Sequence, residues 1–192
     1  MQPILSILTP ACWERIEQAQ ALRDKIAAQI AKHDLPVEHL VLLDNRTRTV
    51  GEKRQALVQS ALGGHIAFVD DDDDVSDDYV ARIVATLAKQ DVDVVTFEQE
   101  AHYNAHQFKV IFGINNDDAP YTPDCTTINR AVWHVCPIRR SIAQAAIFPA
   151  IMDGEDRAWS LQVRPFLKTS AHISRVLHIY RHNTKTTLAS GY

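Results

Sequence analysis

Apolar and polar residues follow two different rhythms over roughly the first 100 positions. Short continuous apolar runs, which are typical of buried strands, occupy Ile4–Leu8, Leu40–Leu43, Ile66–Val69 and Val92–Phe97. Between these runs, apolar residues return every three or four positions, which predicts amphipathic helices. The positions that define the helices are Trp13, Ile16, Leu22, Ile26 and Ile30, then Ala56, Leu57, Ala61 and Leu62, and then Tyr79, Ile83, Val84 and Leu87.

This alternation predicts an α/β fold with a mostly parallel central sheet flanked by helices. Parallel strands need a long crossover, usually a helix, and such crossovers are right-handed. We expect Gly63-Gly64 to close the second helix. The pattern is less regular after residue 100, where histidine and aromatic residues are more frequent. The length of 192 residues suits one domain.

The negative charge of the chain is concentrated at one place. The formal net charge is −4, yet seven aspartates fall within residues 70–78; without them, 24 − 7 = 17 acidic residues face 20 Lys and Arg, which leaves +3. The remainder of the chain is therefore mildly basic. The three cysteines, Cys12, Cys125 and Cys136, are too few and too irregularly spaced for a disulfide framework or a structural zinc site. We expect Cys136 to be buried rather than catalytic.

The sequence favours a soluble, cytoplasmic protein without stable membrane insertion. The first residues lack the basic region and apolar core of a signal peptide. No apolar stretch approaches the ~20 residues that span a bilayer.

Unusual polar segments lie where predicted strands end: Thr9-Pro10, Asp44-Asn45 and Asp70–Asp73. Ligands of α/β sheets bind at the carboxyl ends of strands, so the coincidence predicts a site there. Consecutive ionised aspartates repel one another, and a divalent cation is the simplest counter-charge. Carboxylate oxygens suit Mn²⁺ or Mg²⁺. The alternative, from the residues alone, is a solvated acidic turn before the next helix.

The aspartates belong to a longer set of motifs. Phe68-Val69-Asp70-Asp71-Asp72-Asp73 is followed by Val75-Ser76-Asp77-Asp78-Tyr79-Val80. Upstream lie Ile4–Pro10, Leu43-Asp44-Asn45 and Gly51-Glu52-Lys53-Arg54-Gln55-Ala56-Leu57, and downstream lies Gly154-Glu155-Asp156-Arg157-Ala158-Trp159. In this order, the set resembles family 2 glycosyltransferases of the GT-A fold over roughly residues 4–182. It is similar to their nucleotide loop, second-strand aspartate, Gly-x-x-x-Arg-Asn block (with Gln55 in place of Asn), DxD segment and Glu-Asp motif.

The resemblance implies a role for each member of the aspartate run. Asp70 would contact the nucleoside of the donor, and Asp71 would be the variable middle residue on the donor side. Asp72 would ligate Mn²⁺ or Mg²⁺. Asp73 would not touch the ion but would contact the residues that bind it. The five consecutive aspartates, Asp70 to Asp74, leave the register of the DxD motif open by one residue.

Other residues would bind the nucleotide and its phosphates. The resemblance assigns Thr9, Pro10 and Asp44 to the donor, and Lys53 and Arg54 to its phosphates or to the aspartates. The plainer alternatives are ordinary surface charge for the two cations and an Asx turn for Asp44.

The Glu-Asp motif would carry the catalytic base. The resemblance implies that Asp156 removes the proton of the acceptor hydroxyl, in an inverting reaction without a covalent intermediate. Glu155 precedes it, and Trp159 shares its helix face, where it would exclude water or stack on a sugar ring. The alternative is a pair of acids that stabilise a helix N-terminus.

The C-terminal segment His178-Ile179-Tyr180-Arg181-His182-Asn183 resembles a Tyr-Arg-x-His segment of the family. There a histidine completes the metal site, so His182 is the expected ligand and His178 its alternative. Residues 183–192 suit either a lid or a frayed terminus. We expect the histidines near turns to be solvated, namely His33, His39 and His65.

We therefore expect residues 1–192 to be a single catalytic domain. Residues 1–100 would bind the nucleotide, and residues 101–192 would carry the acceptor site, the base and a C-terminal lid. The expected function is metal-dependent, inverting sugar transfer from a nucleotide sugar, with UDP as the expected nucleotide. The acceptor hydroxyl would belong to a saccharide or to a hydroxylated DNA base, as in a phage enzyme; Arg139-Arg140 and the net +3 lend DNA slight support.

Two other functions remain open at this stage. A nucleotidyltransferase shares the sheet and the acidic metal site, but its usual Gly-rich phosphate loop is missing from Thr9-Pro10-Ala11-Cys12. A non-catalytic nucleotide- or metal-binding protein is the second alternative. The sequence leaves the sugar, the acceptor and the oligomeric state undetermined.

Overall fold

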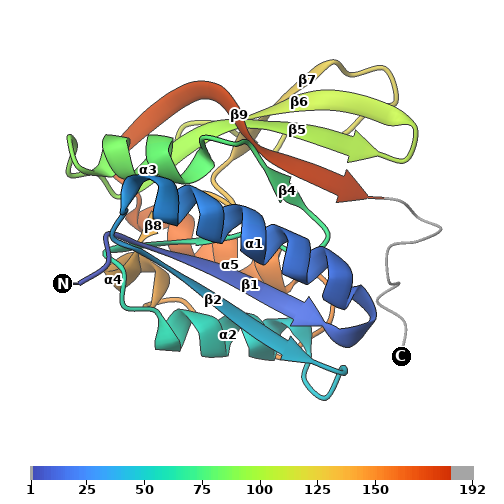
Figure 1. Cartoon of the computed structure of the whole chain (residues 1–192). Coiled ribbons are helices and arrows are strands. Elements are labelled where there is room, and N and C mark those ends of the chain that lie inside the picture. The colour runs from blue at the N-terminus through green and yellow to red at the C-terminus, as the bar shows by residue number, and fades with distance from the viewer. Residues whose placement is uncertain (1, 183–192) are drawn as a thin grey trace.

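The computed structural model describes residues 2–182, and the predicted strands and helices of the first half are present in it (Figure 1). The strands are β1 (Leu5–Cys12), β2 (Val37–Asp44), β3 (His65–Phe68) and β5 (Val94–Tyr103). A short 3₁₀ turn, η1 (Trp13–Arg15), leads into α1 (Ile16–His33), and α2 (Val50–Ser60) and α3 (Tyr79–Leu87) follow. The apolar periodicity therefore located the elements of this half correctly.

The central sheet is mixed, which corrects the expectation of a mostly parallel one. Its order is β2-β1-β3-β8-β5-β6-β7, and β9 pairs with β5 and with β4. Half of the strand pairs are antiparallel, because β8 runs against both of its neighbours and β5 and β6 form a hairpin. The strands of the later part are β4 (Asp74–Val75), β6 (His106–Gly113), β7 (Thr127–Ala131), β8 (Ile138–Arg139) and β9 (Ser170–His182).

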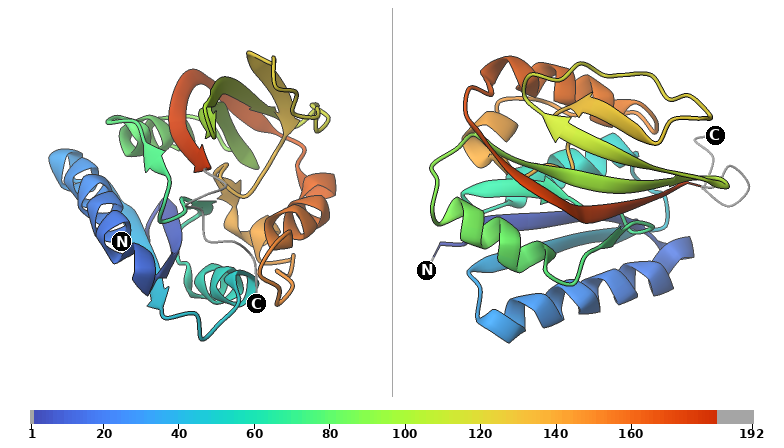
Figure 2. Two further views of the ribbon diagram at one scale, coloured as in Figure 1. Left: turned by 90° about the vertical axis from the view of Figure 1, so that its right-hand side faces the viewer. Right: turned by 90° about the horizontal axis from the view of Figure 1, so that it is seen from above.

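Helices cover both faces of the β2-β1-β3 part of the sheet (Figure 2). On one face α1 packs against α3, and on the other α2 packs against α5 (Glu155–Val163). The short helices α4 (Arg140–Ala143) and η2 (Arg164–Phe166) complete the second half. A continuous apolar core joins the layers and includes Phe68, Phe148 and Trp159. Within residues 2–182, no helix is long and apolar enough to cross a membrane.

Strand β1 continues past its predicted end at Thr9-Pro10. It runs to Cys12, so both residues lie inside the strand and are buried. Proline is tolerated there because β3 pairs only with Leu5–Leu8, which leaves Pro10 paired to β2 alone. The carboxyl end of β1 therefore carries Cys12 and η1 instead.

The second helix also ends differently from the prediction. It stops at Ser60, and Ala61 after it is already extended. Gly63-Gly64 therefore does not cap the helix but leads into β3.

Candidate active site

The aspartate run forms a folded turn at the carboxyl end of β3 rather than a solvated one. The backbone N–H of Asp73 donates to the carbonyl of Asp70 at 3.1 Å and closes the turn. The backbone N–H of Cys12 donates to Oδ2 of Asp71 at 2.9 Å, and that of Arg181 donates to Oδ1 of Asp73 at 3.0 Å. Asp71 and Asp73 are only 1% and 8% exposed, so their carboxylates are held by the ends of β1 and β9.

Positively charged side chains surround this turn. Arg15 lies between two of its carboxylates, 2.6 Å from Oδ1 of Asp71 and 2.7 Å from Oδ2 of Asp72. Lys25 of α1 lies 2.9 Å from Asp74. Sequence reasoning missed Arg15. Its only signal is that it is the first cation after the first strand, and nothing in the local pattern separates it from surface charge.

Burial and neighbouring charges separate the pKa values of these carboxyl groups. Burial raises the pKa of Asp72 to about 6, against the effect of Arg15 and with Asp70 and Asp71 adding to it. Burial, followed by the charges of Asp70 and Asp72, raises the pKa of Asp73 well above its usual range. Burial also acts to raise the pKa of Asp70, but the charge and hydrogen bond of Arg54 outweigh it and lower that pKa.

Arg54 of α2 connects the aspartate turn to the Glu-Asp motif. Its Nη2 donates to Oδ2 of Asp70 at 2.9 Å, and its Nε donates to Oε1 of Glu155 at 3.0 Å. The guanidinium is buried 5.0 Å above the ring of Phe68. Gly51 makes this arrangement possible, because a Cβ there would lie 1.8 Å from the carbonyl oxygen of Pro149 in the chain leading to α5.

The Gln55 that replaces the family's usual Asn has a structural contact of its own. Its side-chain Oε1 accepts a hydrogen bond from the backbone N–H of Phe148 at 2.9 Å. The contact ties α2 to the same stretch of chain that approaches Gly51. Gln55 therefore holds α2 against the segment that leads to α5.

Asp156 lies in the first turn of α5, beside this buried link. Gly154 precedes the helix with φ = +79°, a conformation that favours glycine, and it turns the chain into the helix. The Asp156 side chain is 27% exposed, and its Oδ2 lies 3.8 Å from Nδ1 of His134. His134 is buried and was missed from the sequence, where no motif marks it. Asp156 is thus accessible to a ligand and sits close to a titratable neighbour.

Trp159 is a core residue and does not face a sugar. It is 1% exposed and stacks on Phe148 with ring centroids 4.7 Å apart and planes 7° from parallel. It also meets the edge of Phe68. It packs α5 against β3, which corrects the expectation that it stacks on a sugar ring.

Lys53 and Asp44 form a buried pair at the ends of β1 and β2. Nζ of Lys53 lies 3.2 Å from Oδ1 of Asp44 and donates to the carbonyl of Ala11 at 2.9 Å. Asp44 also accepts the backbone N–H groups of Arg46 and Arg48, so the Asx turn is present. These contacts fix the loop at this edge of the sheet.

The histidine beside the aspartate turn is His178. It is fully buried, its Nε2 lies 3.4 Å from Oδ2 of Asp73, and its Nδ1 forms a hydrogen bond with Gln99 at 2.9 Å. His182 instead stacks on Tyr103 with ring centroids 4.6 Å apart. The predicted lid, residues 183–192, lies outside the described residues.

Two histidines expected to be solvated belong to strands instead. His39 of β2 forms a hydrogen bond with the hydroxyl of Thr9 at 2.9 Å, and His65 of β3 is buried with its Nε2 2.8 Å from the carbonyl of Val92. Burial lowers the pKa of both imidazoles. Thr9 is itself fully buried, and its hydroxyl is paired with His39. Cys136 is buried, as expected.

The donor atoms around the aspartate turn determine which metal ion the site could hold. Within residues 2–182, no group of three or more His, Cys, Asp or Glu side chains is already arranged as a metal site. However, Oδ1 of Asp70 and Nε2 of His178 are buried and have no hydrogen-bond partner. Carboxylate oxygens with one imidazole nitrogen suit Mn²⁺ or Mg²⁺, so the donor set fits such an ion.

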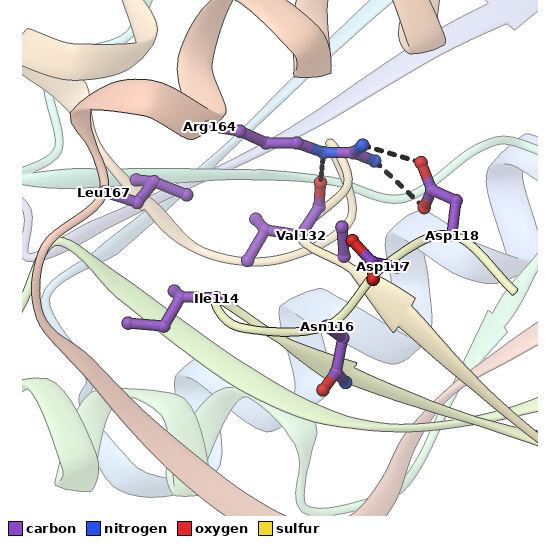
Figure 3. Close-up of a pocket in the computed structure, with 8 residues that line it drawn as sticks. Ile114, Asn116, Asp117, Asp118, Val132, Arg164 and Leu167 are labelled. Carbon is purple, nitrogen blue, oxygen red and sulfur yellow. Dashed lines mark hydrogen bonds and ion pairs between the residues drawn. The ribbon is translucent and has the colours of Figure 1, made fainter.

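A cavity of about 250 Å³ lies elsewhere in the molecule, between the β6–β7 loop and η2 (Figure 3). The guanidinium of Arg164 crosses it, with two nitrogens 2.6 and 3.2 Å from the carboxylate of Asp118 and a third 2.9 Å from the carbonyl of Val132. Arg164 and Asp118 are thus paired with each other, and the lining includes none of the residues at the aspartate turn.

The fold is the GT-A fold, in which an α/β sheet presents acidic residues at the carboxyl ends of its strands. Among solved structures, the chain is similar to S. aureus TarS 1–349, with a TM-score of 0.65 at 15% identity over 94% of this chain. TarS 1–349 in complex with UDP-GlcNAc gives 0.64 at 13% identity over 98%. The catalytic domain of Drosophila β1,4-galactosyltransferase 7 in complex with xylobiose gives 0.54 at 12% identity over 94%.

These likenesses lie in the fold and not in the sequence. No family model and no curated protein matches the sequence. The chain spans 60% of the length of TarS 1–349 and 72% of the galactosyltransferase domain.

Proposed function

We propose that this protein is a glycosyltransferase that moves a sugar from a UDP-sugar to an acceptor hydroxyl. One observation carries the proposal: the aspartate turn, Arg54 and Asp156 meet at one edge of a GT-A sheet. The motifs that resemble family 2 glycosyltransferases fall at this edge, which supports the proposal. TarS, a protein of the same fold, has been crystallised with UDP and with UDP-GlcNAc, which supports UDP as the nucleotide here.

The aspartate turn is the proposed donor and metal site. Asp70, Asp72 and Asp73 offer carboxylate oxygens for Mn²⁺ or Mg²⁺, and His178 offers the nearest nitrogen. When bound, such an ion would neutralise the diphosphate leaving group. Arg15 contacts Asp71 and Asp72 from the end of β1, and its side chain is 23% exposed, so it is a candidate to pair with the diphosphate.

Asp156 is the proposed general base. Its partly exposed carboxylate is in a position to accept the proton of the acceptor hydroxyl as that oxygen attacks the anomeric carbon. Glu155 cannot take this role, because it is buried and hydrogen-bonded to Arg54. A single base with no second carboxylate in the role of nucleophile corresponds to direct displacement and inversion.

The identity of the acceptor is part of the proposal. A saccharide hydroxyl and a hydroxylated DNA base, as in phage DNA modification, are the two candidates. Both present a primary or secondary hydroxyl that needs a base, so the chemistry at Asp156 is the same for either.

The test is release of nucleoside diphosphate from a panel of nucleotide sugars with Mn²⁺. We expect UDP release from one or more UDP-sugars and metal-dependent binding of UDP. Asp72→Asn should abolish that metal dependence. Asp77→Asn is the matched control, because Asp77 lies in the same segment with a side chain that is 98% exposed.

Three outcomes would contradict the proposal. Pyrophosphate release would assign the protein to the nucleotidyltransferases. UDP binding without turnover of any donor, even as slow hydrolysis, would indicate a binding protein. If UDP binding in Asp72→Asn still depends on the metal, Asp72 is not the metal ligand and the assignment of the DxD motif is wrong.

A further inference from the structure

A row of aromatic side chains continues from the aspartate turn along one face of the β9-β5-β6 part of the sheet. His178 and Gln99 are opposite each other on β9 and β5, and their hydrogen bond shows that both point to the face that carries Asp73. Side chains of a strand alternate between faces, so Tyr180 and His182 point to this same face. On β5, the residues opposite them are Ala101 and Tyr103.

Strand β6 extends the row. Opposite Ala101 lies Phe108, and opposite Tyr103 lies His106. Tyr121, from the β6–β7 loop, packs on the rings of Tyr103, His106 and Phe108 at centroid distances of 5.1, 5.6 and 5.3 Å. We call these six rings the aromatic floor: Tyr180, His182, Tyr103, His106, Phe108 and Tyr121.

The aromatic floor lies at the border between the core and the solvent, because Phe108 and Tyr180 also pack against the apolar core. His182 and Tyr103 stack within 10° of parallel, and Tyr180 and His182 within 15°. All six residues are at least partly exposed to solvent, and Tyr121 is 37% exposed. Such a run of partly open rings on one sheet face is suited to stacking against a flat apolar surface of a ligand.

The aromatic floor begins beside the aspartate turn. Ile179, the residue before Tyr180, lies opposite Asp74, and the backbone N–H of Arg181, the residue after it, donates to Oδ1 of Asp73 at 3.0 Å. Arg54 links this turn to Glu155, the neighbour of the proposed base. A ring stacked on the floor at this end would bring its hydroxyls toward the aspartate turn and the start of α5.

The charges beside the aromatic floor disfavour a polyanion. The cations that contact the aspartate run are each paired with one of its carboxylates: Arg15, Lys25, Arg54 and Arg181. Lys109 pairs with Glu98 on the opposite face of the sheet. Binding of DNA depends on cations that are available to its phosphates, whereas a neutral sugar needs rings and a few hydrogen-bonding groups.

We propose that the aromatic floor is the acceptor site and that it binds a neutral saccharide, with the reacting hydroxyl at the Tyr180 end. The proposal rests on the proposed function, because it names the acceptor class of that same site. The tyrosine hydroxyls and histidine nitrogens of the floor supply the polar contacts that orient the sugar.

The experiment separates acceptor binding from donor chemistry. Wild-type protein with UDP and Mn²⁺ is screened against an array of neutral oligosaccharides, and the strongest ligand is titrated by calorimetry. We expect Tyr103→Ala and Tyr121→Ala each to weaken its binding about tenfold, since one aromatic contact is lost. The control is His102→Ala, on the same strand but on the opposite face. UDP affinity and acceptor-independent UDP release should be unchanged in all three variants.

Circular dichroism checks that each variant is folded. Tyr103→Phe keeps the ring and loses only the hydroxyl, so it should bind the saccharide more strongly than Tyr103→Ala. The proposal is overturned if the wild type binds no oligosaccharide of the array, or if Tyr103→Ala and Tyr121→Ala bind as well as wild type. It is also overturned if an oligonucleotide containing 5-hydroxymethylcytosine binds instead. Saccharide binding that depends on Tyr103, without UDP release from any donor, would retain the aromatic floor and reject the transferase.

Discussion

Replacing Arg54 with methionine tests the buried link between the aspartate turn and α5. Arg54 is 3% exposed and is hydrogen-bonded to Asp70 at 2.9 Å and to Glu155 at 3.0 Å. Methionine keeps much of the apolar volume over Phe68 but leaves two buried carboxylates without their cation. Removal of one partner of a buried ion pair typically costs about 3–5 kcal/mol. We therefore expect the free energy of unfolding to fall by about this amount at pH 7.

The loss should depend on pH with a definite sign. In the wild type, Arg54 lowers the pKa of Asp70 below its usual value, so this stabilisation is present at neutral pH and is lost only in strong acid. In Arg54→Met, burial is unopposed and raises the pKa of both carboxyl groups. They take up protons as the pH falls, so the destabilisation should shrink between pH 7 and pH 5.

The measurement is urea denaturation at the two pH values. The matched control is Arg139→Met, which breaks pairs with Asp91 and Asp93 at a side chain that is 32% exposed. We expect at most about 1 kcal/mol there, because exposed pairs contribute little. The reasoning is refuted if Arg54→Met costs no more than Arg139→Met, or if its cost is the same at pH 5 and pH 7.

Three further outcomes are expected. Asp156→Asn should lower kcat by about 10²–10⁴-fold, the usual contribution of a general base, while UDP affinity in calorimetry stays unchanged; equal losses of both would place Asp156 in donor binding. Trp159→Ala should lower the unfolding free energy by about 3–5 kcal/mol in urea denaturation, since it empties a core site, and a fully stable variant would contradict its burial. His39 has a pKa lowered to about 4, by burial and then by Arg23, so it stays neutral in the fold while the unfolded chain takes up a proton below pH 6.5. His39→Gln should therefore flatten the loss of stability between pH 6.5 and pH 4 in urea midpoints, and an unchanged slope would count against it.

The sequence located what depends on local pattern. The apolar runs of β1, β2, β3 and β5 and the periodicity of α1 to α3 are properties of neighbouring residues, and the structure contains these elements. The aspartate run could be placed at the end of a strand because the strand and the run are contiguous. The Gly154-Glu155-Asp156 sequence likewise marked the start of a helix, because the acids and the turn-forming glycine are adjacent.

Contacts between residues far apart in the sequence could not be predicted from local patterns. Arg15 contacts Asp72 across 57 residues, and no periodicity encodes that meeting. Strand β8 has two residues, too few to show a strand pattern, yet it makes the sheet mixed. Trp159 was expected to exclude water or stack on a sugar because it shares a helix face with Asp156, and its packing on Phe148, 11 residues earlier, is not visible in the sequence pattern.

The wide sequence separation of the contacts at the aspartate turn has a consequence during synthesis. Arg54 meets Glu155 across 101 residues, and the backbone of Arg181 meets Asp73 across 108. At about 5–20 residues translated per second, the aspartates wait about 5–20 s for these partners. During that interval, water takes the place of the Arg181 backbone N–H as the hydrogen-bond partner of Asp73, so the turn lacks its final contacts. The proposed donor site can therefore form only after β9 has been synthesised, when β1 to β3 have already had time to pair.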